Sequence, residues 1–283
     1  MILHGGDWFD RPDISPGIAR EFAVLIRDFN RPVYSVAGNH DMYGQNPETV
    51  RRTMLGVFEA IGLIELLGID GEIIFEKGGT RLQLTGRPYR YDIDDEDFKR
   101  YYLVRKRSDC DYAINMIHGM LVEKPLPQGV AFTLIEEITD TGADITLSGH
   151  YHSGFGIKEI GGKYFVNPGS IARLSGTTAD IGRMPGVIII ELGETVKIEE
   201  IALKSALSGD EVLEKSSPDS IDAENEIRSF FNEVRITLEF GGMNIDGILN
   251  KIASDSKIDV KVRNEAIRRI SQARERLDAG VDA

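Results

Sequence analysis

Short apolar segments alternate with longer amphipathic ones over residues 1–205, and this alternation constrains the fold more than any other feature of the sequence. The apolar segments have the length of strands, and most of them run into loops that contain glycine. The expected strands cover residues 1–7, 32–38, 112–120, 144–150, 163–170, 186–192 and 196–203, with a hairpin over 71–87 that turns at Gly78–Gly79. The expected helices cover residues 16–29, 46–62 and 131–138. Strands that alternate with helices predict an α/β fold.

The composition changes after residue 205. Residues 206–222 are polar and rich in turn-forming side chains, which indicates a linker between a core at 1–205 and a second unit. Residues 223–283 then read as strand, helix, strand and helix. This pattern predicts a small C-terminal α+β domain.

The overall composition excludes several classes of protein. No apolar run is long enough to cross a bilayer, and no secretory signal is visible at the start, so we expect no membrane association. The single cysteine, Cys110, excludes an internal disulfide, and the expected compartment is the cytoplasm. A net charge of −13 argues against a protein that coats nucleic acid with a basic surface, although a nuclease with metal-binding carboxylates remains compatible with it.

Four of the five histidines lie at the ends of expected strands, each next to glycine or close to one. They are His40, His118, His150 and His152. In an α/β sheet, the loops that leave the carboxyl ends of the strands line the ligand-binding crevice, so residues from separate strands meet there. The shared position of these histidines therefore predicts a common site.

Asp7 and Asp10 follow the first expected strand in the same way, and Asn39 precedes His40. A carboxylate, an amide oxygen and several imidazoles form a mixed oxygen and nitrogen shell, which suits Mn, Fe or Zn better than Ca. The neighbouring glycines allow the backbone to turn sharply and to approach an ion closely. The sequence thus predicts a metal site at the strand ends.

Four sequence blocks, taken in order, carry a resemblance to a known family. "GDWFD" (6–10), "GNHD" (38–41), "IHG" (117–119) and "GHYH" (149–152) resemble the motifs of the calcineurin-like metallophosphoesterases over residues 1–200. The resemblance implies an α/β fold with four layers in the order α/β/β/α. It also implies hydrolysis of phosphoester bonds at a two-metal site.

The resemblance assigns a role to each motif residue. Asp7 would bridge two ions, Mn²⁺ by expectation, with Fe, Zn or Mg as alternatives. The ligands of one ion would be Asn39, His118 and His150, and His152 would bind the other ion. His40 would face the scissile phosphate as an electrostatic stabiliser or general acid, with Asp41 orienting it. A histidine suits this task because it can supply a positive charge or a proton near neutral pH.

One block of the family pattern is absent. Members normally open with an Asp-x-His block some tens of residues before the "GD" motif, and here Asp7 follows Met1 after five residues. His4 lies upstream but at a different spacing. Three explanations stay open: a shortened or misassigned start, completion of the site by another chain, or a one-metal or non-catalytic relative that serves as a binding scaffold.

The substrate has three candidate classes. "FVNPGSIARL" (165–174) and the expected C-terminal domain resemble DNA repair exonucleases of the SbcD type, which implies DNA as substrate, a homodimer and an ATPase partner subunit. Small cytoplasmic phosphodiesterases share the same segment. "GDWFDRPD" also resembles the serine/threonine phosphatases, with Arg11 at the position of their phosphate-binding arginine and Pro12 in place of a glycine. Arg11 and Tyr151 are the candidate substrate-binding residues.

Overall fold

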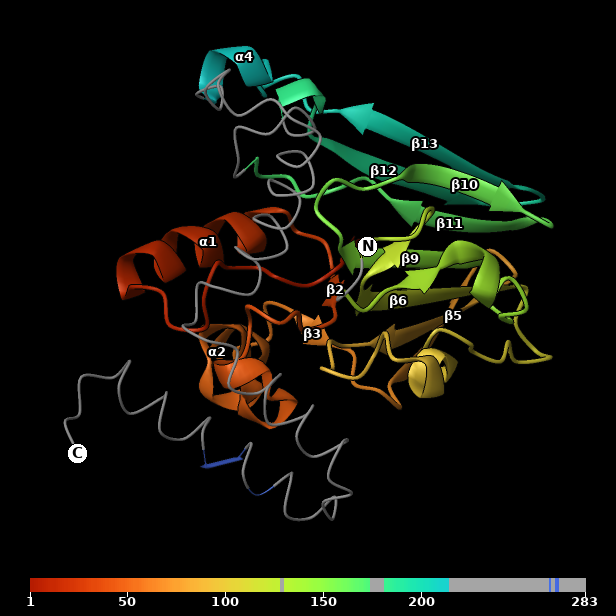
Figure 1. Cartoon of the computed structure of the whole chain (residues 1–283), viewed down its shortest axis with the longest axis horizontal. Coiled ribbons are helices and arrows are strands. Elements are labelled where there is room, and N and C mark those ends of the chain that lie inside the picture. The colour runs from red at the N-terminus through yellow and green to blue at the C-terminus, as the bar shows by residue number, and fades with distance from the viewer. Residues whose placement is uncertain (128–129, 174–180, 214–264, 266–267, 270–283) are drawn as a thin grey trace.

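The chain is described here by a computed structural model, which covers residues 1–127, 130–173, 181–213, 265, 268 and 269. Two sheets form the centre of the fold (Figure 1). The smaller sheet is parallel and consists of β1 (Ile2–His4), β2 (Val33–Ser35) and β3 (Glu65–Leu66). The larger sheet has the order β10 (Gly156–Ile160), β11 (Lys163–Asn167), β9 (Ile145–His150), β6 (Tyr112–Gly119), β5 (Thr80–Arg87) and β4 (Glu72–Lys77).

Helices cover the outer faces of the two sheets. The smaller sheet is covered by α1 (Pro16–Asp28) and α2 (Met54–Ala60), which lie together on one side of it (Figure 1). The outer face of the larger sheet packs against two short 3₁₀ helices, η3 (Glu96–Tyr101) and η4 (Ile135–Ile138). This arrangement confirms the expected α/β fold, and its layers follow the order helix, sheet, sheet, helix.

Three apolar clusters hold these layers together. The first joins α1 and α2 to the smaller sheet through residues such as Ile26, Val33 and Phe58. The second lies between the two sheets, where Val36 and Met116 are buried. The third joins the larger sheet to η3 and η4. Burial of apolar surface between successive layers supplies most of the stability and fixes the sheets face to face.

The described chain contains further elements at the edges of these layers. They are η1 (Tyr43–Gln45), η2 (Pro47–Arg52), β7 (Leu121–Val122), β8 (Thr133–Leu134), the antiparallel hairpin of β12 (Gly186–Leu192) and β13 (Val196–Ala202), and α4 (Gly209–Val212). Apolar residues of β12 and β13 pack against the cluster between the two sheets. The expected strands of the first 205 residues are all present.

Two of the expected helices differ in the structure. The helix expected over 46–62 is divided into η2 and α2, because the hydroxyl of Thr53 accepts the N–H of Gly56 and starts a new helix. The side-chain oxygen of Asn46 caps η2 by accepting the N–H of Glu48 at 3.0 Å. The helix expected over 131–138 is wrong in its first half, since β8 pairs with β7 there and only η4 is helical.

The C-terminal half of the domain prediction lies outside the described residues. The expected linker at 206–222 is described only to residue 213, and this part includes α4. The expected α+β domain at 223–283 falls outside the described residues except for three positions. None of the helices in the described ranges is long and apolar enough to cross a bilayer.

Candidate metal centre

The predicted ligands come from the carboxyl ends of four parallel strands in the two sheets. Asp7 follows β1, Asn39 follows β2, His118 is the penultimate residue of β6, and His150 is the last residue of β9. The two sheets meet here because Gly5 and Gly149 bring their backbones close together, leaving no space for a Cβ atom at Gly149. The strand ends therefore place all four side chains at one point of the molecule.

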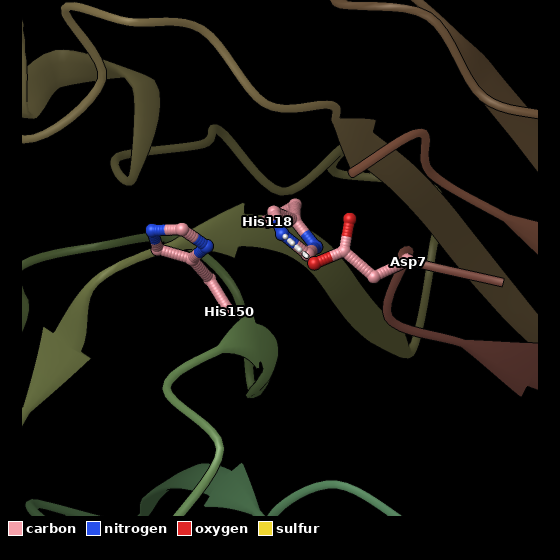
Figure 2. A group of neighbouring side chains, drawn as sticks. All are labelled: Asp7, His118 and His150. Carbon is pink, nitrogen blue, oxygen red and sulfur yellow. Dashed lines mark ion pairs between the residues drawn. The ribbon is translucent and has the colours of Figure 1, made fainter. Parts of the chain in front are cut away.

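Asp7, His118 and His150 form a cluster in which the candidate ligand atoms all lie within 4.8 Å of one another. Figure 2 shows the His118 ring between the Asp7 carboxylate and the His150 ring. His118 Nε2 lies 3.2 Å from Asp7 Oδ2 and 3.1 Å from Asn39 Oδ1. The structure thus brings together four of the five residues that the sequence predicts as metal ligands.

The hydrogen bonds of His118 determine which ring nitrogen carries a proton. His118 Nδ1 lies 2.6 Å from the carbonyl oxygen of Gly5, which can only accept, so Nδ1 donates. In the neutral ring, Nε2 then presents a lone pair toward the oxygens of Asp7 and Asn39. Three lone pairs at this distance repel one another unless a cation or a proton lies between them. A divalent ion bound among these three atoms would remove the repulsion.

Backbone strain marks two of the four positions. Asp7 has a φ of 55° and His150 a φ of 79°, both in the left-handed region that side chains other than glycine rarely adopt. Such conformations cost roughly 1–3 kcal/mol each, and they concentrate at functional sites where the surrounding structure enforces them. The fold thus maintains an unfavourable backbone at both positions, and each of them carries a member of the ligand cluster.

Three buried polar atoms at the site make no hydrogen bond to any described residue. They are Asp7 Oδ2, whose described contact is the ion pair with His118, together with His150 Nδ1 and His40 Nε2. A buried polar group without a partner costs free energy, so native proteins rarely leave one. The oxygen and nitrogen donors of Asp7, Asn39, His118 and His150 fit a divalent transition ion, whose binding would satisfy the first two of these atoms.

Asp41 contacts the main chain of the site and makes no described hydrogen bond to His40. Its carboxylate accepts the N–H groups of Asp7, Trp8 and Gly38, at 2.8, 2.9 and 2.8 Å. No described hydrogen bond supports the predicted role of Asp41 in orienting His40, and that role stays a prediction. The hydrogen bonds of Asp41 fasten the loop after β1 to the loop after β2, because a carboxylate can accept several N–H groups at once.

His40 lies between these two loops. Its main-chain N–H donates to Asp7 Oδ1 at 2.9 Å, and its ring Nδ1 lies 2.8 Å from the carbonyl oxygen of Asp10. Because that carbonyl can only accept, Nδ1 carries the proton and Nε2 carries the lone pair of the neutral ring. Asp10 contributes its carbonyl group to the site, and its side chain is exposed.

Electrostatic coupling within the cluster shifts several pKa values. Burial alone would raise the pKa of Asp7, but the His118 imidazole, with His40 and His150, holds it below its usual value. Burial and then the charge of Asp7 raise the pKa of Asp41 to about 7, against the effect of its N–H donors. Burial works against the charged form of His118, yet Asp7 raises its pKa. Burial and His118 hold the pKa of His150 well below the ordinary value.

The remaining predicted site residues are not members of the described ligand group. His152 is two residues beyond His150, its carbonyl accepts the N–H of Ser170, and it is not a member of the described ligand group. Its role as a ligand of a second ion stays a prediction. Arg11 is exposed and lies 3.7 Å from Asp13, and Tyr151 is half-buried. His4 accepts the N–H of Gly6 and stacks on Trp8, at 4.0 Å between ring centres.

Tyr89 is a site residue that the sequence did not identify. Its ring centre lies 5.5 Å from that of His150 and 6.1 Å from that of His118, and its hydroxyl is hydrogen-bonded to Gln45 at 3.1 Å. It follows β5 just as the histidines follow their strands, and this position was the signal available in the sequence.

Comparisons with solved structures give distant likenesses. SoxB, a sulfate thiohydrolase of Thermus thermophilus, is 15% identical, with a TM-score of 0.40 over 82% of this chain and 42% of that protein. An archaeal phosphodiesterase is 14% identical, with a TM-score of 0.32 over 71% of this chain and 81% of the other. Vps29 of Entamoeba histolytica, solved with zinc, is 14% identical, with a TM-score of 0.28 over 71% of this chain and 97% of that protein. The chain thus spans less than half the length of SoxB.

A comparison with curated proteins found no significant match. The sequence profile of the calcineurin-like phosphoesterases, in contrast, matches residues 1–154, which is more than half of the 283 residues. This range contains all four motif blocks and every residue of the ligand cluster. The chain belongs to the calcineurin-like phosphoesterase family, whose members are metal-dependent phosphoesterases.

Proposed function

We propose that this protein hydrolyses phosphodiester bonds, that its activating ion is Mn²⁺, and that its substrate is DNA. One observation carries the hydrolytic part of the proposal: Asp7 Oδ2 and Asn39 Oδ1 converge on His118 Nε2, at 3.2 and 3.1 Å. Together with His150 they offer two oxygens and two imidazole nitrogens. Mn²⁺ accepts such a mixed shell.

Divalent ions bound there would supply Lewis-acid activation of both a water molecule and the phosphoryl group. The residues of the chain would bind the metal, position the ligand loops and orient the His40 ring. Asp7, Asn39, His118 and His150 would bind the metal, and Asp41 would hold the two ligand loops in register through its three N–H contacts. The Asp10 carbonyl would keep the His40 ring oriented through Nδ1.

His40 would act at the ester bond that breaks. In its protonated form, Nε2 would donate a proton to the leaving oxygen as the P–O bond breaks, and water would supply the oxygen that replaces it. Nε2 is suited to this role because it is buried and makes no described hydrogen bond, whereas Nδ1 is already bonded to Asp10. The products would be a phosphomonoester and an alcohol.

Support for DNA comes from the loop after β11. Arg183 contacts the carbonyl and hydroxyl groups of Ser170, and Arg173 contacts the carbonyl groups of Arg183 and Leu207. Ser170 in turn donates its N–H to the carbonyl of His152. Two guanidinium groups thus lie on a segment that is hydrogen-bonded to the loop of the metal site. A polyanionic backbone could bind to these two groups. The homodimer and the ATPase partner remain predictions.

The test is a hydrolysis assay on metal-stripped protein. We expect Mn²⁺ to start hydrolysis of bis(p-nitrophenyl) phosphate and of linear DNA, and EDTA to stop both. Asp7→Ala should abolish both activities, because it removes a carboxylate from the cluster. Hydrolysis of the small diester without hydrolysis of DNA would identify a small-molecule phosphodiesterase. Mn²⁺ binding without any hydrolysis would identify a scaffold and contradict the proposal.

A further inference from the structure

A second buried polar cluster lies behind the metal centre and contains no metal-ligand candidate. Asp94 is 9% exposed, and its carboxylate accepts three hydrogen bonds. The donors are the hydroxyl of Tyr102 at 2.5 Å, the hydroxyl of Thr133 at 3.0 Å, and the main-chain N–H of Met120 at 2.8 Å. We call Asp94, Tyr102 and Thr133 the Asp94 cluster.

A carboxylate in this position is costly unless its partners compensate for burial. Burial raises the pKa of Asp94, while Tyr102, Met120 and Thr133 act in the opposite direction through their hydrogen bonds. The fully buried Tyr102 is likewise held in its neutral form, because burial and Asp94 raise its pKa well above the usual value. An apolar side chain could often fill such a space at lower cost, which favours a task other than packing for this cluster.

The contacts of the cluster indicate that task. Met120 is two residues beyond His118, and its N–H is bonded to Asp94 while its carbonyl accepts the N–H of Thr133. Between them, Gly119 has no space for a Cβ atom because the Tyr102 hydroxyl lies against it. The end of β6 is therefore fixed immediately after the residue that carries the imidazole.

We propose that Asp94 is a positioning residue for the metal centre, which fixes the end of β6 so that the His118 ring meets Asp7 and Asn39. This proposal rests on the metal site of the proposed function. His118 itself is held at its Nδ1 atom by the carbonyl of Gly5. The ring is thus supported at one side by Gly5 and at the main chain by Asp94, and both supports are needed to direct Nε2 toward the ion. Such indirect supports typically alter metal affinity about 10–100-fold when they are removed.

The test measures Mn²⁺ affinity by calorimetry on metal-stripped full-length variants. We expect Asp94→Asn to weaken Mn²⁺ binding about 10–100-fold. The amide NH₂ group of asparagine is itself a donor, so at least one of the three groups that donate to Asp94 would lose its acceptor. Tyr102→Phe should cause a smaller loss, since two of the three hydrogen bonds remain. The matched control is Thr85→Val, which removes a buried hydroxyl that bonds Asn115 between β5 and β6. It should lower stability and leave affinity unchanged.

A second readout requires no metal. In metal-free protein, the ring nitrogens of His118 can be followed by long-range ¹H–¹⁵N NMR, and we expect the Nδ1 proton to exchange faster in Asp94→Asn and Tyr102→Phe than in Thr85→Val. If Asp94→Asn does not fold, Tyr102→Phe decides the question alone.

The outcomes separate the two proposals. Wild-type affinity in both Asp94→Asn and Tyr102→Phe would overturn the positioning role and leave the metal centre intact. An equal loss in Thr85→Val would also overturn it, because the effect would then follow general destabilisation. If the wild-type protein binds no Mn²⁺, the proposed function fails, and the NMR comparison decides the positioning role: unchanged exchange of the Nδ1 proton would overturn it.

Discussion

At the scale of single residues, His40 differs from the other histidines of the site. His118 and His150 belong to the cluster of ligand atoms, whereas the ring of His40 is held by the Asp10 carbonyl and has a free, buried Nε2. The loop that carries His40 is fixed independently, through the carboxylate of Asp41. Removal of the His40 ring therefore leaves the supports of the metal ligands in place.

We expect His40→Ala to bind Mn²⁺ with wild-type affinity and to lose about 10²–10⁴-fold in turnover of a phosphodiester. The reason is that the ring would supply a proton at the leaving oxygen and does not bind the ion. Calorimetry and a steady-state assay on the same preparation provide both values. Weakened Mn²⁺ binding with turnover largely retained would show that His40 is a ligand instead.

His4 makes the stability of the metal-free protein depend on pH. Burial lowers the pKa of His4 from 6.5 to about 4, so the unfolded chain binds a proton more readily than the folded protein. The contribution of neutral His4 to the free energy of unfolding is fully present above pH 6.5. It is lost as the pH falls to about 4, and the loss amounts to about 3 kcal/mol. Denaturant titrations at pH 6.5 and at pH 4 should show that the free energy of unfolding falls less in His4→Asn than in the wild type. Equal losses would contradict the assignment.

The residues that meet at the candidate metal centre could be predicted from the sequence, and the contacts that hold them there could not. His118 and His150 were identifiable because they follow apolar segments next to glycine, and parallel strands bring such positions together. The partners of Asp41 and the ring of Tyr89 depend on main-chain geometry between loops that are distant in sequence. No local pattern encodes such contacts.

At the scale of elements, the site depends on how closely two strands approach. Gly5 follows β1 and Gly149 precedes the last residue of β9, and a Cβ atom on Gly149 would collide with the Gly5 carbonyl. That same carbonyl holds His118 Nδ1. The contact between the two glycines therefore sets the position of a ligand ring as well as the junction of the two sheets.

Gly149→Ala should separate these strands and weaken Mn²⁺ binding at least about 10-fold, since it displaces the support of a ligand imidazole. Gly17→Ala is the matched control, because the nearest atom to its Cβ is the Ser15 hydroxyl at 3.9 Å, in ordinary contact. Gly17 lies inside α1, where alanine is favoured over glycine by about 1 kcal/mol. Calorimetry should find unchanged affinity in the control, and a Gly149→Ala protein with the same affinity would contradict the account.

The sequence also predicted strands better than helices. Strands such as β6 and β9 are continuous apolar segments bounded by turns, and their order follows from the parallel α/β arrangement. The division between η2 and α2 depends on the Thr53 hydroxyl, which a helical pattern of apolar residues does not reveal. The segment before η4 became a strand because β7 was available to pair with it, a tertiary contact that overrides local preference.

At the scale of the whole molecule, a net charge of −13 means that DNA would have to bind through a local basic surface. The loop after β11 offers Arg173 and Arg183 next to the metal-site loop. We expect Arg173→Gln to weaken DNA binding several-fold and to reduce the salt dependence by about one phosphate contact. Turnover of bis(p-nitrophenyl) phosphate should not change.

The control for this prediction is Arg27→Gln, which removes an exposed charge that pairs with Asp28 on α1. Binding to labelled DNA at several salt concentrations provides the comparison. An equal effect of the two substitutions would show that the protein's total charge, and not the loop after β11, determines DNA binding.

The central claim is that Asp7, Asn39, His118 and His150 hold a divalent metal, and one calorimetric titration tests it most directly. Metal-stripped wild-type protein and the Asp7→Asn variant are each titrated with Mn²⁺ under the same conditions. The account predicts saturable binding to the wild-type protein, and an affinity reduced at least about 100-fold when the carboxylate between the loops is replaced. Absence of binding in the wild type, or equal affinity in the two proteins, would contradict it.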